Sequence, residues 1–423
     1  MKIGRYVVAF GLVVSAQAAC ASPQYTTLYQ FTGRGSGSNP QAGLIADANG
    51  NLYGTTSTGG NNKDYAGTVF ELTPPAQNGA KWTLTTLWRF HDGEGASPVG
   101  GLVLDKSGAL YGTTSSGANV HQLWGTAFKL SPPANGATKW SFERIWIFRA
   151  NREGAIPDAG LVMDGSGALY GTTSLAGAGH GEGWGTAFKL TPPAQNGGAW
   201  TFDRLCFFAQ NERAGGQPIA PLYLDQSGNL YGTAFSGGGR AGGDGDAFML
   251  TPPHNGGTAW TRTVIARFGK VDSAPAGGFV PGEGGVLYGT ASGLGDGSAG
   301  AVYELTPPAN GATKWKTTTL FQFNGADGAT PFGALTLDGS GGFYGSTFNG
   351  GVFGYGTVFH LLPPANGSKK WRLILLHSFE LVANKPSAIQ PNGGLLLGSD
   401  GALYGTAFQD TKYFSGAVFR LDP

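Results

Sequence analysis

The sequence predicts an all-β fold, a single seven-bladed β-propeller closed by an N-terminal outer strand. Three observations indicate it: a phrase that recurs seven times, four strand-like segments in each repeat, and a last repeat that lacks one of the four. The phrase is Leu-Tyr-Gly-Thr or a close variant, and consecutive copies lie 56 to 61 residues apart. A period in this range is typical of repeat architectures. The tyrosines of the seven copies are Tyr53, Tyr111, Tyr170, Tyr231, Tyr288, Tyr344 and Tyr404.

The second repeat shows the four strands in order. An apolar run at 101–105 and the Leu-Tyr-Gly-Thr segment at 109–114 flank a polar turn. A third strand at 125–130 ends at a Pro-Pro pair, because proline cannot donate to a sheet ladder. A fourth strand at 140–148 places apolar residues at every second position over most of its length. Four short antiparallel strands per repeat describe a propeller blade.

The two ends of the chain indicate how the ring closes. The last repeat stops after its third strand, 417–421. The N-terminal segment 26–31, Thr-Thr-Leu-Tyr-Gln-Phe, matches the fourth strand at 85–90, Thr-Thr-Leu-Trp-Arg-Phe. We therefore expect 26–31 to complete the blade of Tyr404 as its outermost strand, which protects edges that an open array would expose. The propeller is expected to span residues 25–423.

The N-terminus predicts export. Residues 1–21 contain two positive charges, a short apolar run and then small residues, which is the pattern of a secretory signal peptide. The run is too short to anchor the chain in a bilayer, and no stable membrane span is expected later in the sequence. We expect a secreted or periplasmic protein, with lipidation at Cys20 as the alternative. Cys206 lies in an apolar strand-like run, where a buried inert thiol is expected.

The composition supports a packed chain and excludes one class of partner. Glycine accounts for 75 of 423 residues, but the 40% of hydrophobic and 12% of aromatic residues supply enough apolar surface for a core. The formal net charge is +1 and no cluster of lysine and arginine occurs. Nucleic-acid binding needs a basic footprint, so no nucleic-acid partner is expected.

The repeat resembles a known family. The pattern Gly-Leu-x-x-Asp-x-x-Gly-x-Leu-Tyr-Gly-Thr-Thr, followed by Gly-Thr-Val-Phe-x-Leu-Thr-Pro-Pro, stands most clearly at 43–56 with 67–75. It resembles the GloVer tandem repeat over residues 25–423. The resemblance implies an exported bacterial surface protein of undefined biochemical role. Such proteins often end in a sorting anchor, which is not seen at the end of this sequence, so attachment by that route is not expected. Three positions depart from the pattern, with Gly282 and Gly398 replacing the turn aspartate and Pro221 the leading glycine.

The residues that recur in every repeat are expected to build the blades. The aspartates of the Asp-x-x-Gly turns could form a catalytic ring, but their context favours caps of the turns. The motif tyrosines and threonines could line repeated ligand sites. Recurrence in every blade favours packing instead, with tyrosine between blades and threonine bonded within the sheet. Function is therefore expected in two sets of variable loops that open on one face.

An aromatic residue often precedes the glycine that opens the third strand, and this position lies on the variable face. Blades four and five lack it, so the aromatic residues are expected to form an arc. Flat aromatic faces suit stacking against the apolar faces of sugars, and burial between blades is the alternative. The predicted ligand-binding residues are Tyr65, Trp124, Trp184, Tyr355 and Phe414.

Histidines and carboxylates gather in the loops of the second and third blades. Such pairs can act as acid and base, but no tight metal-binding spacing occurs, so we expect neither a metal site nor a cofactor. The weak catalytic candidates are His91, His121, His180 and Glu182. The leading hypothesis is an exported, monomeric, non-catalytic binding or scaffold propeller with a glycan or protein ligand. The alternative is a carbohydrate-active enzyme, such as a polysaccharide lyase, that uses the loop histidines.

Overall fold

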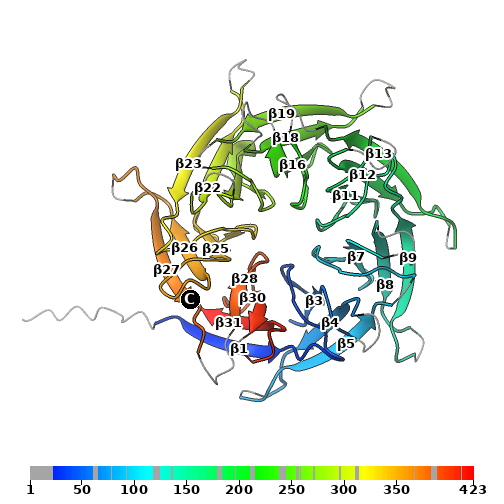
Figure 1. Cartoon of the computed structure of the whole chain (residues 1–423), viewed down its shortest axis with the longest axis horizontal. Helices are drawn as coiled ribbons and strands as arrows, with labels where there is room; N and C mark the ends of the chain where they lie inside the picture. Colours follow the sequence, from blue (N-terminus) through cyan, green and yellow to red (C-terminus); the bar gives the residue numbers. More distant parts are fainter. Residues whose placement is uncertain are drawn as a thin grey trace, which may run out of the picture.

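Seven antiparallel sheets stand around a central axis and form a closed ring (Figure 1). The predicted seven-bladed propeller is thereby confirmed. The expected signal peptide, residues 1–21, lies outside the described residues. Within the described part of the chain, no helix is long and apolar enough to cross a bilayer. The computed structural model describes residues 22–423 apart from 61–64, 78, 92, 118–123, 135–136, 179–182, 196, 210–214, 238–243, 254–256, 258, 270–271, 295–296, 310–313, 366, 383–387 and 411.

Each blade has four principal strands, which follow one another outward from the axis. The innermost strands are β2 (Ile45–Ala46), β6 (Val103–Leu104), β10 (Val162–Met163), β15 (Tyr223–Leu224), β20 (Val280–Pro281), β24 (Thr336–Leu337) and β29 (Leu396–Leu397). The second strands carry the Leu-Tyr-Gly-Thr motif and are β3 (Leu52–Thr56), β7 (Leu110–Thr114), β11 (Leu169–Thr173), β16 (Leu230–Ala234), β21 (Leu287–Ala291), β25 (Phe343–Thr347) and β30 (Leu403–Asp410).

The outer half of each blade contains the two longer strands that flank the Pro-Pro turn. The third strands are β4 (Thr68–Thr73), β8 (Thr126–Ser131), β12 (Thr186–Thr191), β18 (Asp246–Thr251), β22 (Ala301–Thr306), β26 (Thr357–Leu362) and β31 (Ala417–Asp422). The outermost strands are β5 (Thr83–Arg89), β9 (Ser141–Ile147), β13 (Thr201–Phe207), β19 (Thr261–Arg267), β23 (Lys316–Gln322), β27 (Arg372–Ser378) and β1 (Gln24–Gln30). Short additional elements are β14 (Gly215–Gly216), β17 (Ser236–Gly237), β28 (Ala388–Pro391) and the 3-10 turn η1 (Glu283–Gly285).

The N-terminal strand closes the ring, as the sequence predicts. β1 pairs antiparallel with β31, from Gln24 opposite Asp422 to Gln30 opposite Ala417 (Figure 1). The clasp also contacts the preceding blade, because the ring of Tyr25 stacks on His377 of β27 with centroids 4.2 Å apart. The first and last parts of the chain therefore share one sheet, and the last blade gains the outer strand that its own repeat lacks.

The motif residues have the expected packing role, with one correction. Each motif tyrosine lies between neighbouring blades, as where Tyr53 meets Trp140 edge-on. The second threonine bonds within its own blade, as Thr114 does with Thr126 at 2.8 Å. The hydroxyl at the first threonine position instead reaches the next blade in five blades, as where Thr113 Oγ1 donates to the carbonyl of Ala159 at 3.1 Å. The hydroxyls of Thr55 and Thr233 make no hydrogen bond with the described residues. The expectation that threonine bonds within the sheet is therefore right only for the second of the pair.

The turn aspartates cap their turns. Asp105 Oδ1 accepts from the backbone N–H groups of Ser107 and Ala109, and Oδ2 accepts from the hydroxyl of Tyr111. In the last repeat, where Gly398 replaces the turn aspartate, Asp400 accepts from the hydroxyl of Tyr404 at 2.9 Å. The same tie between turn and motif tyrosine is thus rebuilt from a residue two positions later.

A repeated seam joins each blade to the next. The residue before a proline that recurs in all seven blades adopts a positive φ of 55–60°, although none of these residues is glycine. Its N–H donates to a carbonyl of the preceding blade, as Ile156 does to Trp124 at 3.0 Å. Its own carbonyl accepts within its blade, from the N–H of Ser174 at 3.0 Å in the same example. The seven seam residues are Asn39, Ser97, Ile156, Gln217, Ala274, Thr330 and Gln390.

A glycine of the preceding blade packs against the proline of each seam. Gly125 has a φ of +91°, and a Cβ at this position would come within 2.6 Å of Pro157 Cδ and would also strike the carbonyl of Thr114. We predict that Gly125→Ala lowers the free energy of unfolding by at least about 2 kcal/mol, through backbone strain and overpacking. Chemical denaturation measures the loss. Gly165→Ala is the control, because a Cβ there meets nothing within 4 Å. Equal stability of the two variants would contradict the tight glycine–proline packing at the seam.

The clasp makes the fold sensitive to acid. Burial lowers the pKa of His377 to about 4, so the folded protein favours the neutral ring. The resulting stabilisation is complete above the ordinary histidine pKa of about 6.5 and is lost as the pH falls from there towards 4. We predict that the wild type loses about 1–3 kcal/mol more stability than His377→Phe between pH 7.5 and pH 4.5. Denaturation curves at both pH values measure this difference, and parallel losses in the two proteins would show that His377 is not responsible.

Candidate functional site

The variable loops open on one face, where two sets of segments meet. Because adjacent strands are antiparallel, the segments that enter each innermost strand lie at the same end of the blade as the loops after each second strand. The Asp-x-x-Gly and Pro-Pro turns lie at the other end. We call the first end the variable face. Candidate side chains from both the aromatic and the histidine predictions belong to it.

The structure shows how exposed the predicted aromatic residues are. Trp124 and Trp184 are 38% and 37% exposed, and Tyr65 and Phe414 are 59% and 63% exposed. Tyr355 is half-buried and packs against the core between the last two blades. Complete burial between blades, the alternative interpretation, therefore does not describe the two tryptophans.

The five aromatic residues occupy two different positions of the repeat, which sequence reasoning treated as one. Trp124, Trp184 and Tyr355 directly precede the glycine of the seam, and their carbonyls accept the N–H of the next seam residue at 2.8–3.0 Å. Tyr65 and Phe414 stand one residue earlier and have positive φ values of 47° and 54°. Only the first group offers its own carbonyl to the next seam residue, so only these three residues share one backbone position relative to the next blade.

The histidine candidates are only partly described. His121, His180 and Glu182 lie outside the described residues. His91 pairs with Glu94 at 3.2 Å, and the other carboxylate oxygen of Glu94 accepts from the indole N–H of Trp88 at 2.9 Å. Both oxygens of Glu94 are thus engaged. Over the residues that the structure covers, no group of three or more histidine, cysteine or acidic side chains could hold a metal ion.

The one free thiol that the structure describes does not suit nucleophilic chemistry. Cys206 lies in β13, and burial raises the pKa of its thiol to about 11, so the thiolate is scarcely populated at neutral pH. The expectation of an inert thiol agrees with this environment.

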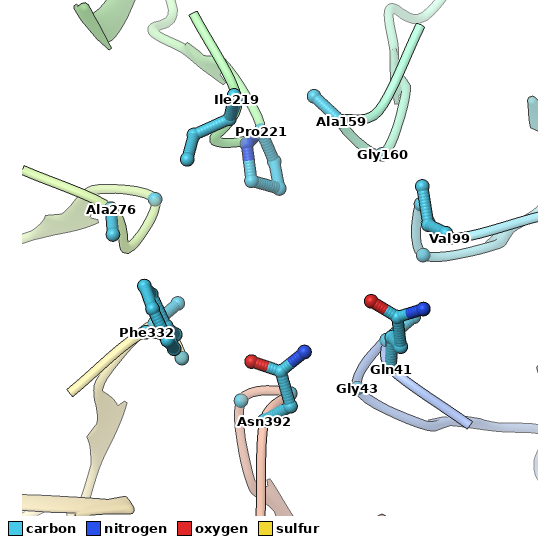
Figure 2. Close-up of a pocket in the computed structure, with 18 of the residues that line it drawn as sticks. Gln41, Gly43, Val99, Ala159, Gly160, Ile219, Pro221, Ala276, Phe332 and Asn392 are labelled. Atoms are coloured by element: carbon cyan, nitrogen blue, oxygen red, sulfur yellow. The ribbon is translucent and has the colours of Figure 1, made fainter. Parts of the chain in front are cut away.

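A cavity on the axis of the ring was missed by the sequence reasoning. It has a volume of about 670 Å³ and lies where the seven segments that follow the seam prolines converge (Figure 2). The residue directly after each proline borders it, and this residue is different in all seven blades although the proline is constant. That contrast is the signal that could have found the site. The seven residues are Gln41, Val99, Asp158, Ile219, Ala276, Phe332 and Asn392.

Glycine and other small residues let the inner segments approach the axis. A Cβ on Gly43 would lie 2.9 Å from the carbonyl oxygen of Gly394 in the neighbouring blade, closer than packed side chains allow. Gly43 is the leading glycine of the Gly-Leu-x-x-Asp pattern, so that position narrows the ring below the variable side chains. The cavity is therefore lined largely by backbone and small residues, together with the side chains that differ between blades around its opening (Figure 2).

Polar side chains at the mouth have unused hydrogen-bonding groups. The amides of Gln41 and Asn392 lie side by side and point into the opening (Figure 2). Gln41 Nε2 donates to Ser57 Oγ at 3.0 Å, which leaves its carbonyl oxygen available. The amide of Asn392 has no hydrogen-bond partner among the residues that the structure describes. These two side chains can both donate to and accept from a ligand.

Aromatic rings border the same cavity. Phe332 and Phe348 lie edge-to-face with centroids 5.7 Å apart, and Phe348 and Phe408 lie 6.3 Å apart. All three are half-buried, so their remaining surface faces the opening. Phe332 lies beside Asn392 in the ring (Figure 2). The cavity thus has an apolar wall over blades six and seven, next to the two amides.

Asp158 is the one titratable side chain among the described residues that border the cavity. It belongs to the third blade, and its neighbour Ala159 lies across the opening from Phe332 and Asn392 (Figure 2). Ser174 Oγ donates to Asp158 Oδ2 at 2.8 Å. Burial raises the pKa of Asp158 to about 6, against the lowering effect of that hydrogen bond. Since the raised pKa disfavours the charged form, the ionised carboxylate costs stability at neutral pH; such a cost is common at functional sites.

Several solved structures match the chain at low sequence identity. The extracellular domain assigned to a one component system from B. thetaiotaomicron matches with a TM-score of 0.53 and 14% identity, over 95% of this chain and 42% of that chain. A protein of unknown function from Dyadobacter fermentans matches with a TM-score of 0.47 and 11% identity, over 95% of this chain and all of the other. An oxidoreductase assigned as glucose dehydrogenase, from Thermus thermophilus, matches with a TM-score of 0.44 and 14% identity, over 95% and 100% of the chains.

No curated protein matches the sequence. The model of one repeat family does, in three overlapping segments, residues 9–143, 124–359 and 262–423. Together these cover every motif tyrosine and both strands of the closing pair. The chain belongs to the Gloeobacter/Verrucomicrobia repeat family.

Proposed function

We propose that the protein is exported and binds a glycan, without catalysis, on its variable face. The observation that carries the proposal is the exposure of Trp124 and Trp184, 38% and 37%, at equivalent positions of adjacent blades. A large apolar ring held at the surface costs solvation free energy, which binding of a partner recovers. Two such rings on consecutive repeats suit a ligand that itself repeats.

The backbone carbonyl of each of these tryptophans is hydrogen-bonded to the next blade. The carbonyls of Trp124 and Trp184 accept the N–H groups of Ile156 and Gln217 in the next blades, at 3.0 and 2.8 Å. A ring whose backbone is fixed loses little conformational entropy when a ligand stacks on it. Fixed aromatic platforms are therefore better suited to binding than mobile exposed rings.

Export is part of the proposal and rests on residues 1–21. Their charges, apolar run and small residues fit a signal peptide that is removed after export. Mass spectrometry of the mature N-terminus should find a start near residues 19–22. A diacylglyceryl group on Cys20 would instead place the propeller on a membrane surface through a lipid anchor.

Truncation of the exposed tryptophans is expected to weaken binding. A glycan array identifies the ligand, and titration of the best glycan then compares the wild type with Trp124→Ala and Trp184→Ala. Each substitution should cost about 1–3 kcal/mol of binding, on the scale known for aromatic stacking with nucleobases. Leu337→Ala is the control, because Leu337 is also exposed but lies next to the Asp338 turn, at the opposite end of its blade. Its affinity should match the wild type.

Two results would contradict this function. Unchanged glycan affinity in both tryptophan variants would show that these rings do not form a binding platform. A protein ligand whose affinity falls in the same two variants would show that the ligand is a protein and not a glycan. Depolymerisation of a polysaccharide that is abolished by His91→Ala or His180→Ala would favour a carbohydrate-active enzyme. The pairing of His91 with Glu94 at 3.2 Å is the contact that such an enzyme would use.

A further inference from the structure

We propose that the central cavity holds one end of the glycan, as a terminal neutral sugar or disaccharide, so that the propeller recognises chain ends. The inference rests on the proposed glycan function and adds a second site, on the axis, to the tryptophan platform. It is argued from the unused polar atoms, the aromatic wall, the charge and the size of the cavity.

The polar groups at the mouth match a ligand with several hydroxyl groups. Asn392 offers a free amide, Gln41 a free carbonyl oxygen, and Asp158 an oxygen, Oδ1, with no partner among the described residues. A hydroxyl both donates and accepts, so a ring bearing several of them can satisfy all three side chains. None of these atoms is fully buried, so water can bond them in the free protein. A sugar whose hydroxyl groups reproduce those hydrogen bonds can replace this water.

The aromatic wall matches the other side of a sugar ring. Phe332, Phe348 and Phe408 border the cavity beside the amides, so a bound ring meets apolar and polar surfaces at once. The C–H face of a pyranose is apolar and its edge carries hydroxyls. A mostly apolar cavity with a few placed polar groups is the usual form of a small-molecule site, and about 670 Å³ lies within the usual range of volumes.

Charge restricts which sugars can enter. Asp158 carries the one ionisable side chain at the cavity, and none of the described residues that border it is lysine, arginine or histidine. A uronic acid or a sulfated sugar would meet a carboxylate with no cation to offset the repulsion. Neutral sugars avoid this penalty, so they are the expected occupants.

The cavity and the tryptophan platform are connected through the seam. Ile156, whose N–H donates to the carbonyl of Trp124, stands two residues before Asp158. Gln217, which donates to the carbonyl of Trp184, stands two residues before Ile219. A chain whose end lies in the cavity can therefore leave it over the third and fourth blades, towards the two tryptophans.

The test uses neutral and acidic sugars directly. Saturation-transfer NMR and calorimetry of the mature protein measure binding of glucose, galactose, mannose, xylose and their disaccharides, with glucuronate and galacturonate as acidic counterparts. At least one neutral sugar should bind saturably and the acidic ones should not. Asn392→Ala and Asp158→Asn should each weaken that binding about tenfold or more. Gln226→Ala, an exposed amide on the opposite face, should leave it unchanged.

Folding is controlled within the same set. Asp158→Asn removes a charge that burial disfavours, so its melting temperature at pH 7 should equal or exceed that of the wild type. Lost binding in a variant of undiminished stability is therefore an effect on the site.

The outcomes separate the cavity from the platform. The cavity inference is wrong if neutral sugars do not bind, or if Asn392→Ala and Asp158→Asn bind them with wild-type affinity. The proposed function is still supported in that case, provided that a polysaccharide binds and that its binding depends on the two tryptophans. The opposite result is that Asn392→Ala and Asp158→Asn abolish the binding of neutral sugars while Trp124→Ala and Trp184→Ala leave polysaccharide binding unchanged. In that case the cavity inference is supported and the tryptophan platform is wrong. Preferred binding of uronates would overturn the charge argument and with it the proposal.

Discussion

The rest of the structure depends on the seam between blades. At each of the seven seams, a residue with positive φ before a proline donates its N–H to the preceding blade, over 2.7–3.0 Å, and its carbonyl faces its own blade. A side chain in this backbone region costs about 1–3 kcal/mol unless its surroundings compensate. Seven-fold repetition of the strained corner indicates that the inter-blade hydrogen bond and the glycine–proline contact provide that compensation.

The seam also explains why variation is tolerated at the axis. The proline fixes the chain direction, and the residue after it points to the opening with no part in the inter-blade contacts. Gln41, Asp158 and Asn392 can therefore stand where other blades have Val99 or Ala276. The fold does not require this carboxylate, because the other six blades form without one at the equivalent position. The free-energy cost of burying ionised Asp158 is therefore not a consequence of building the propeller. A stability cost at a position that the fold leaves free favours a role in binding.

Repetition decided what the sequence could predict. The period, the strands and the closing N-terminal segment were readable because each is local and occurs several times. The bond from Thr113 to Ala159 was not, because it joins positions 46 residues apart in different repeats. The cavity escaped for the same reason, because its lining combines short segments from all seven blades that lie far apart in the sequence. Tyr65 and Trp124 were grouped by their distance to a glycine, although one residue of offset changes the backbone tie.

A closed ring of similar blades repeats each surface position once per blade but has a single central axis. Side chains repeated on the blades can offer a polymer several similar contacts, and Trp124 and Trp184 are such a pair. The axis offers one place that all seven blades surround, and there the blades differ: aromatic rings at blades six and seven, amides at seven and one, a carboxylate at three. Because the blades surround the cavity, a polymer reaches it along the axis, and its end can do so more easily than an interior unit, from which the chain continues in both directions. The combination of a platform at the edge of the blades with an axial cavity that the blades surround is thus a physical basis for distinguishing the ends of a polymer from its middle.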